Sequence, residues 1–333
     1  MAGARISEDG GIRVELEGRV FMLDPSGPTR ADYAFVSHAH VDHMHKPSKS
    51  EKVISSQETR ELAAARGFDL GATTQDADGV ELLDSGHILG SRALRLQEEV
   101  YYTGDASGRE RAFLARCKTK QARLLIMETT YGRPEYVFPS TAKLVGEVND
   151  LIGQLYHRGR PVVLMGYPLG KAQLLNYFFS GWEPLYVHDR VADMNEVHMK
   201  HGVALKAGTR YNPEADSDSL PPGPWLMIAP MSSGRSRAMA HLRQKYGAAL
   251  IAFSGWALNE GYARSLGADF AFPVSDHCDY PELLKIAREV SPEVVYTTHG
   301  FAREFSHDLR KLGFSARTLD SGQSSLHEYT RKE

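Results

Sequence analysis

The amino-acid sequence predicts an α/β fold made of two parts. Short apolar, β-prone segments recur along the chain, and several end directly at a histidine or a carboxylate residue. Between residues 139 and 253 such segments alternate with helical stretches, as in a separate α/β unit of about one hundred residues. A length of 333 residues also favours two domains, or one domain with a large insertion.

Composition and charge restrict the class of protein. The net charge of −3 argues against a protein that coats nucleic acid by bulk electrostatics, but it leaves room for an enzyme that attracts phosphate locally. The chain has only two cysteines, Cys117 and Cys278, in no paired spacing, so a disulfide framework is not expected. No apolar segment has the length of a signal peptide or a membrane span. The sequence therefore predicts a cytoplasmic protein that does not enter a membrane.

The first predicted element is a hairpin over residues 11–24, where apolar and polar residues alternate. It ends at Asp24, just before Pro25. Two interpretations of Asp24 are open: a turn residue, or a carboxylate that fixes the tautomer of a ligating imidazole from behind.

The most informative motif follows the apolar run 33–36 and has the pattern H-x-H-x-D-H. His38 and His40 are two positions apart, so in an extended segment their side chains face the same side and can bind one ion. Asp42 and His43 follow too closely to reach that ion without strain. They therefore indicate a second metal beside the first.

Three later residues extend this pattern. His87 lies in a glycine-flanked loop after a predicted strand and supplies a third nitrogen for the first metal. Asp105 follows another strand, and its two carboxylate oxygens suit a bridge between two ions. His299 ends the strand 294–298. The expected ligands are His38, His40 and His87 for one metal, Asp42, His43 and His299 for the other, and Asp105 for both.

The second half of the chain adds further candidate residues. Glu128 ends the strand 124–127, where it is either a site residue or a solvated strand-end charge. Gly170 and Lys171 start a helix and could bind phosphate, with plain helix initiation as the alternative. The sequence also predicts helices after the capping residues Ser55 and Ser140 and around Pro281, and a basic cluster of Arg235, Arg237, Arg243 and Lys245 that is either a solvated helix face or a phosphate contact.

The ordered set Asp24, His38-x-His40-x-Asp42-His43, His87 and Asp105 resembles the motifs of the metallo-β-lactamase superfamily. This resemblance implies an αβ/βα sandwich with two metals, usually zinc, at one edge of two sheets. Because that superfamily contains lactamases, thioesterases, lactonases and nucleases, the fold alone leaves the reaction open.

Three segments of the second half resemble the additional motifs of the β-CASP nucleases within that superfamily. They are Glu128-Thr-Thr-Tyr131, Ser275-Asp-His277 and Thr298-His-Gly300. The resemblance implies an inserted α/β β-CASP cap domain at residues 139–253, within a metallo-β-lactamase domain of residues 1–138 and 254–333. Within that family the chain resembles ligase-associated DNA exonucleases, and also archaeal messenger-RNA 3′-end processing factors. It departs from the former after Trp256, where residues 257–263 contain no arginine.

The resemblance also implies roles for individual residues. His277 would be a general acid, with Glu128 orienting it, and Asp24 would support the ligands; a role for His277 as a ligand of the second metal stays open. The expected cofactors are two divalent metal ions, zinc first, with manganese or iron as alternatives. The expected partner is a DNA or RNA substrate. No substrate-binding residue is assigned.

The function predicted from these motifs is hydrolysis of phosphodiester bonds in single-stranded DNA or RNA, as an exonuclease in nucleic-acid processing or repair. A second hypothesis is a small-molecule hydrolase of esters, thioesters or β-lactams, which needs the metals but neither the insertion nor Glu128 and His277. A third, an inactive scaffold protein, predicts lost ligands, and every ligand position is filled in this sequence. The first hypothesis accounts for most of the motifs.

Overall fold

A computed structural model describes residues 3–216 and 218–319 of the chain. Contacts divide it into two compact units. The first comprises residues 1–110, 114–137 and 277–333, and the second comprises residues 111–113 and 138–276. Both combine helices with sheets, which confirms the predicted α/β class. Among the described residues, no helix combines the length and the apolar character needed to cross a membrane.

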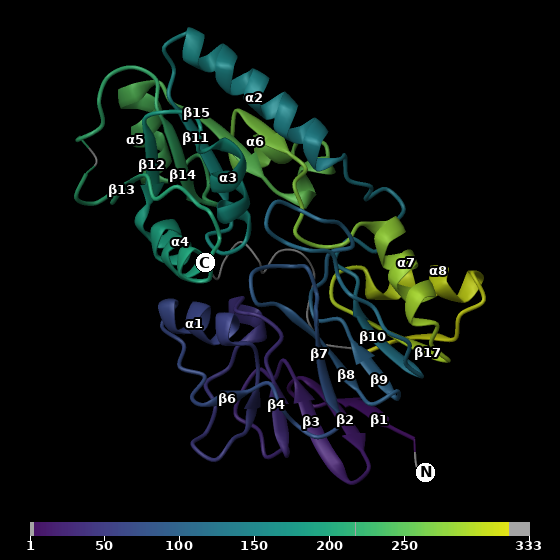
Figure 1. Cartoon of the computed structure of the whole chain (residues 1–333). Helices are drawn as coiled ribbons and strands as arrows, with labels where there is room; N and C mark the ends of the chain where they lie inside the picture. The colour runs from purple at the N-terminus through teal and green to yellow at the C-terminus, as the bar shows by residue number, and fades with distance from the viewer. Residues whose placement is uncertain (1–2, 217, 320–333) are drawn as a thin grey trace. The chain divides into compact units, whose positions relative to one another are not determined.

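The first sheet of the first unit is formed by the first quarter of the chain (Figure 1). Its strands pair in the order β1 to β6, antiparallel up to β3 and parallel from there. The antiparallel pair β2 and β3 is the predicted hairpin. The strands are β1 (Arg5–Glu8), β2 (Ile12–Leu16), β3 (Arg19–Leu23), β4 (Tyr33–Phe35), β5 (Val53–Ile54) and β6 (Thr73–Thr74).

The second sheet of this unit joins distant parts of the sequence. Its order is β18-β17-β10-β9-β8-β7, so the strand that carries His299 pairs in parallel with the strand that ends at Glu128. The strands are β7 (Val80–Asp84), β8 (Arg92–Leu96), β9 (Val100–Tyr102), β10 (Leu124–Glu128), β17 (Val294–Thr298) and β18 (Ala316–Thr318).

The two sheets pack face to face around one apolar core. Alternating residues such as Val14 and Leu16 of the first sheet meet Leu94, Tyr102 and Ile126 of the second. The opposite face of the second sheet is covered by helices α7 (Tyr280–Val290) and α8 (Ala302–Lys311). The second sheet is therefore buried on both faces, which fixes its strand ends in place.

Helix caps confirm two predictions and correct a third. Ser140 caps α2 (Thr141–His157), and Pro281 lies in the first turn of α7, as expected. The helix cap predicted at Ser55 is wrong: Ser56 caps α1 (Gln57–Ala65) by accepting from the Thr59 N–H. The Ser55 hydroxyl instead donates to the carbonyl of Val36, a contact between neighbouring strands that local sequence does not reveal.

The second unit is a parallel α/β sheet with helices on both faces. Its strand order is β13-β12-β14-β11-β15-β16 (Figure 1). Residues of α2, α3 and α4 share one apolar core with one face of the sheet, and residues of α5 and α6 share another with the opposite face. The elements are β11 (Val162–Gly166), α3 (Lys171–Phe179), β12 (Leu185–His188), α4 (Asp189–Lys200), β13 (Thr209–Tyr211), β14 (Leu226–Pro230), α5 (Arg237–Tyr246), β15 (Ala249–Phe253), α6 (Tyr262–Leu266) and β16 (Phe270–Phe272).

The structural boundary of the second unit differs from the boundary expected at residue 253. The strand β16 pairs in parallel with β15, through Ile251 and Phe270 among others, so the sheet continues beyond β15. The unit therefore extends to Asp276, and it also includes Arg111–Phe113. Residues 320–333 of the expected C-terminal segment lie outside the described residues.

Candidate metal centre

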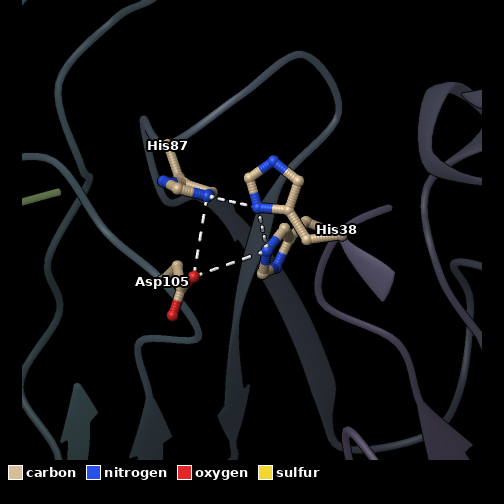
Figure 2. Close-up of side chains that lie close together, drawn as sticks. His38, His87 and Asp105 are labelled. Carbon is tan, nitrogen blue, oxygen red and sulfur yellow. Dashed lines mark hydrogen bonds and ion pairs between the residues drawn. The ribbon is translucent and has the colours of Figure 1, made fainter. Parts of the chain in front are cut away.

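Three histidine side chains converge at one end of the two sheets of the first unit. His38 and His40 follow β4, and His87 follows β7. The Nδ1 atom of His40 lies 3.1 Å from His38 Nε2 and 3.1 Å from His87 Nε2. Figure 2 shows His38 and His87 directed toward each other and toward Asp105. The structure thus brings together the three histidines predicted for the first metal.

Asp105 completes this cluster with a carboxylate oxygen. Its Oδ2 atom lies 3.5 Å from His38 Nε2, 3.6 Å from His87 Nε2 and 3.5 Å from His43 Nε2. One ligand atom from each of His38, His40, His87 and Asp105 lies within 4.8 Å of the others. Asp105 therefore also contacts His43, from the set predicted for the second metal.

The second predicted set is less tightly gathered. His43 Nε2 lies 3.8 Å from Asp42 Oδ2, and the rings of His43 and His299 are 5.5 Å apart between centroids. His43 belongs to the short helix η1 (Val41–His43), whereas His299 follows β17 with a left-handed φ of 57°. Within residues 3–216 and 218–319, no group of three or more residues whose ligand atoms lie within 4.8 Å of one another contains Asp42, His43 or His299.

Asp24 interacts with one histidine of each predicted ligand set, with His43 directly and with His38 through Ser37. Its Oδ2 atom accepts hydrogen bonds from the Ser37 hydroxyl (2.6 Å), the Tyr102 hydroxyl (2.8 Å) and His43 Nδ1 (2.8 Å). Because the Ser37 hydroxyl proton is used by Asp24, we assign the 2.9 Å contact of Ser37 with His38 as donation from His38 Nδ1. Both imidazoles then carry their proton on Nδ1 and present the Nε2 lone pair to a metal.

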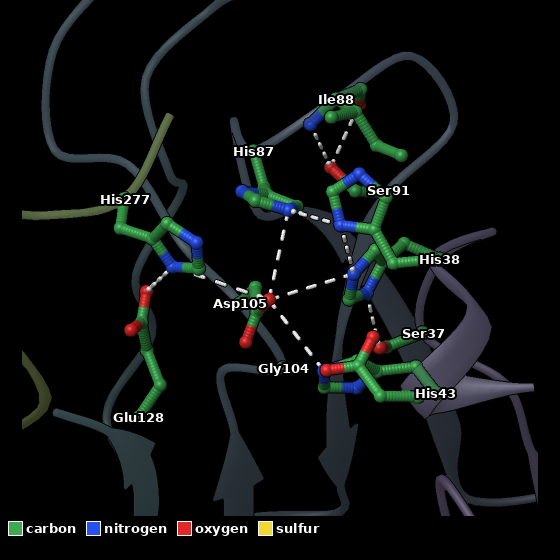
Figure 3. A network of polar contacts seen from close by, with 12 residues as sticks. Ser37, His38, His43, His87, Ile88, Ser91, Gly104, Asp105, Glu128 and His277 are labelled. Carbon is green, nitrogen blue, oxygen red and sulfur yellow. Dashed lines mark hydrogen bonds and ion pairs between the residues drawn. The ribbon is translucent and has the colours of Figure 1, made fainter. Parts of the chain in front are cut away.

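Glu128 and His277 form a pair beside the cluster (Figure 3). The Glu128 carboxylate lies 3.0 Å from His277 Nδ1 and accepts from the backbone N–H groups of Ala106 (3.0 Å) and Thr130 (3.1 Å). Burial alone would raise the pKa of Glu128, but attraction to His277 and these hydrogen bonds outweigh it and lower the pKa. His277 Nδ1 is also 4.0 Å from Asp105 Oδ2.

The electrostatics of the cluster favour a bound cation. Burial and the neighbouring histidines lower the pKa of His38 well below its usual value, so this imidazole is neutral and its lone pair is available. Burial raises the pKa of Asp105 to about 7 despite attraction to His43 and His277. Converging nitrogen lone pairs and a buried carboxylate repel one another unless a positive charge lies between them. The donor set of imidazoles and carboxylate suits zinc or a similar divalent ion.

Sequence reasoning missed Ser37 and Tyr102 as parts of this site. Ser37 directly precedes His38, and a hydroxyl residue next to a predicted ligand is a weak signal of support. Tyr102 lies in β9, the strand before Asp105, but its contact with Asp24 depends on the packing of the two sheets.

Gly170 and Lys171 do start α3, and the Lys171 side chain binds Asp276. Within the basic cluster, Arg243 pairs with Asp269 and Arg235 donates to two backbone carbonyls.

Comparisons with known proteins find several relatives. The chain is 35% identical, over 89% of its length, to a protein of Opitutus terrae named Probable DNA ligase. It is 26% identical over 52% of its length to Transcription termination factor FttA of Methanothermobacter thermautotrophicus, and 26% identical over 51% to an RNase J-like protein of Methanocaldococcus jannaschii. The matches cover 29%, 30% and 43% of those proteins, so the chain spans less than half of each.

A solved structure resembles the whole chain. It is a protein of unknown function from Enterococcus faecalis, with a TM-score of 0.61 and 16% sequence identity, and the match covers 96% of this chain and 98% of that one. At this identity the likeness concerns the fold alone. No family model matches the chain.

The fold and the buried histidine and aspartate cluster define an α/β protein with a candidate metal centre. The names of these relatives fit the β-CASP family of the metallo-β-lactamase superfamily, which the sequence motifs resemble.

Proposed function

We propose that this chain is a metal-dependent nuclease that hydrolyses phosphodiester bonds of single-stranded DNA or RNA, acting as an exonuclease in nucleic-acid processing or repair. The names of its relatives, a probable DNA ligase, a transcription termination factor and an RNase J-like protein, support a nucleic-acid substrate. Because the chain spans less than half of each, their other activities need not accompany it.

The observation that carries the proposal is the position of the Glu128–His277 pair beside the metal cluster. Asp105 belongs to both groups, since one ligand atom from each of Asp105, Glu128 and His277 lies within 4.8 Å of the others. A hydrolase for activated esters needs a metal centre but no proton donor of this kind. When a phosphodiester of a nucleic acid is hydrolysed, the leaving group is the alkoxide of a weakly acidic sugar alcohol. Its departure therefore depends most on such a proton donor.

The residues have distinct roles in this proposal. His38, His40, His87 and Asp105 would hold one divalent ion, and Asp42, His43 and His299 together with Asp105 would hold a second. When bound, such ions polarise a phosphate and neutralise its charge. Asp24 holds the imidazoles of His38 and His43 in the tautomers that ligation requires.

His277 supplies a proton to the leaving oxygen. Glu128 accepts the Nδ1 proton of His277 at 3.0 Å, which stabilises the imidazolium and leaves Nε2 to donate. Glu128 is itself only 1% exposed and is fixed by two backbone N–H groups. The pair is therefore held in place before a substrate arrives.

The family also supports a finer description of the architecture. We propose that the first unit is the αβ/βα metallo-β-lactamase sandwich, with its two sheets packed face to face and helices outside. The second unit would then be the inserted β-CASP cap. Its parallel sheet and the position of its sequence between Glu128 and His277 support this assignment.

The proposal predicts that the zinc- or manganese-loaded protein degrades end-labelled single-stranded DNA or RNA, with 5′-phosphate and 5′-hydroxyl versions compared. A product ladder that grows from one end is the expected result for an exonuclease. Replacement Asp105→Asn, which removes the shared carboxylate charge, should lower the rate by at least about a hundredfold. Turnover of a thioester or β-lactam without cleavage of either nucleic acid would overturn the proposal.

Metal analysis of His277→Ala separates the two roles considered for His277. As a general acid, this side chain can be removed with unchanged metal content and a rate lower by about 10²- to 10⁴-fold. Loss of one bound ion per chain would assign His277 to the second metal instead.

A further inference from the structure

A buried ion pair in the second unit lies next to His277 in the sequence. The ammonium group of Lys171 contacts the Asp276 carboxylate at 2.7 Å, and the two side chains are only 2% and 4% exposed. Lys171 is the first residue of α3, whereas Asp276 is the last residue of its unit. His277, the next residue, donates to Glu128 in the candidate metal centre.

Stability alone does not explain a buried pair of this kind. Removing two charges from water costs several kcal/mol per ion, and apolar residues of similar size often serve at least as well in a core. Lys171 lies on the same helix as Leu175 and Phe179, which belong to the core of this unit, and the ring of Tyr167 lies 5.3 Å from its ammonium group. The pair therefore specifies a position for Asp276 that an apolar contact would leave loose.

The helix start that carries Lys171 is itself rigidly built. Gln173 accepts a hydrogen bond from the Gly170 backbone at 2.7 Å and donates to the Pro168 carbonyl at 3.0 Å and to Asn195 at 2.9 Å. A Cβ atom placed on Gly166 would lie 3.2 Å from the Lys171 side chain. Strand β11 and the side chain of Lys171 are thus in close contact, and the lysine has little freedom to move.

A second buried cation fixes the residue before Asp276. The guanidinium of Arg111, which is 3% exposed, donates to the Ser275 carbonyl at 3.0 Å. On the other side of His277, the Cys278 N–H donates to the Ala106 carbonyl at 2.7 Å. The backbone on both sides of His277 is therefore tethered, and the two residues before it are each held by a buried positive charge.

We propose that Lys171 is a positioning residue for His277: by fixing Asp276, the residue before His277, it restrains the backbone from which the imidazole extends. This inference rests on the proposed role of His277 as the general acid. Lys171 itself touches neither substrate nor metal in this scheme. A role in orientation predicts that its loss affects the reaction only where a proton must be delivered.

Two substrates with different leaving groups test this. Hydrolysis of an oligonucleotide releases a sugar alkoxide, a leaving group that needs a proton from a general acid. Hydrolysis of bis(p-nitrophenyl) phosphate releases p-nitrophenolate, a leaving group that needs none. We expect Lys171→Met to lower kcat on the oligonucleotide by about a hundredfold and kcat on the activated ester at least tenfold less. His277→Ala should show the same selectivity. The variant that combines Lys171→Met with His277→Ala should cleave the oligonucleotide no more slowly than His277→Ala alone.

The design includes matched controls. Arg210→Met removes a cation from another ion pair of the same unit, with Asp193 at 2.9 Å, and should change neither rate by more than about twofold. Lys171→Met leaves a buried carboxylate unpaired and could unfold the chain. Lys171→Met with Asp276→Asn removes both charges and, judged folded by circular dichroism with metal content unchanged, should show the same selectivity.

Specific results overturn the inference. Two results would mean that Lys171 does not act through His277. The first is an equal loss of kcat on both substrates in the folded variant that combines Lys171→Met with Asp276→Asn. The second is a combined effect of Lys171→Met and His277→Ala on kcat that equals the product of the two single effects. If His277→Ala lowers kcat equally on both substrates, His277 is not the general acid, and the inference about Lys171 fails with it. Failure of the wild-type chain to cleave nucleic acid overturns the proposed function, a result distinct from cleavage that is insensitive to Lys171.

Discussion

Asp24 shows how much of this centre depends on a residue that binds no metal. Its carboxylate accepts hydrogen bonds from Ser37, Tyr102 and His43, and through Ser37 it controls the tautomer of His38. One side chain therefore orients an imidazole from each of the two expected ligand sets. It also adopts a left-handed φ of 43°, which Asn tolerates better than most other residues.

Replacement Asp24→Asn should therefore leave the fold intact and weaken metal binding. An amide offers one acceptor oxygen to a site that presents several donors, so at least one imidazole loses its fixed tautomer. The expected loss is about 10- to 100-fold in zinc affinity, measured by competition with a chelating dye. The control Asp78→Asn removes a carboxylate whose side chain is 98% exposed and should bind zinc as the wild type does. Equal affinity in Asp24→Asn would contradict this role.

The elements of the chain differ in how far local sequence determines them. The strand predicted over residues 294–298 is observed as β17, and the apolar run before Glu128 is β10, because β-prone runs with polar ends need little tertiary information. The helix cap at Ser56 and the pair Lys171–Asp276 were not predictable in this way. The partners of the pair are 105 positions apart, and only the completed sheet brings them together.

The same limit applies to the candidate centre. The proximity of the four residues of the first cluster could be predicted, since His38 and His40 share one segment and His87 and Asp105 each follow a strand. The gathering of Asp42 and His299 around a second ion stays a prediction, because it depends on side-chain positions that neither spacing nor strand placement fixes. Local order along the chain predicts which residues approach a site, and packing decides their distances.

The turn between β17 and α8 connects an element boundary to the site. Gly300 has a φ of 54°, and a Cβ atom there would lie 2.4 Å from the Thr130 Cα. We expect Gly300→Ala to lower the free energy of unfolding of the metal-free protein by on the order of 3 kcal/mol, measured by urea denaturation. The adjacent His299 should move with the turn.

Gly146 is the matched control for this substitution. It lies inside α2, and a Cβ atom there meets nothing within 4 Å. Gly146→Ala should stabilise the protein by about 0.5–1 kcal/mol, because alanine loses less backbone entropy in a helix. Destabilisation by both substitutions, or by neither, would show that the close approach at Gly300 does not control the turn.

At the scale of the whole molecule, acid should destabilise the second unit through His198. This imidazole donates Nδ1–H to the Met194 carbonyl, and burial lowers its pKa from 6.5 to about 4. As the pH falls below 6.5, the unfolded chain binds a proton that the folded chain does not, so stability is lost between about pH 6.5 and pH 4. The expected loss is about 3 kcal/mol.

Comparison with His198→Gln isolates this contribution from the protonation of other groups. Glutamine does not titrate, so the stability difference between the variant and the wild type should be constant above pH 7 and shift in favour of the variant down to about pH 4. Urea midpoints across this range measure it. A difference that does not change with pH would show that His198 is protonated equally in both states.

The path of the chain between its two units has a consequence for the order of synthesis. Arg111–Phe113 belong to the second unit although unit-one residues flank them, and the first unit is completed only by residues after Asp276. The centre draws on positions from Asp24 to His299. During translation, which adds residues from the N-terminus, the second unit is finished before the last strands of the first emerge. A partly made chain that stops before His277 therefore lacks both His277 and His299, so the proposed centre is incomplete until these residues have been added.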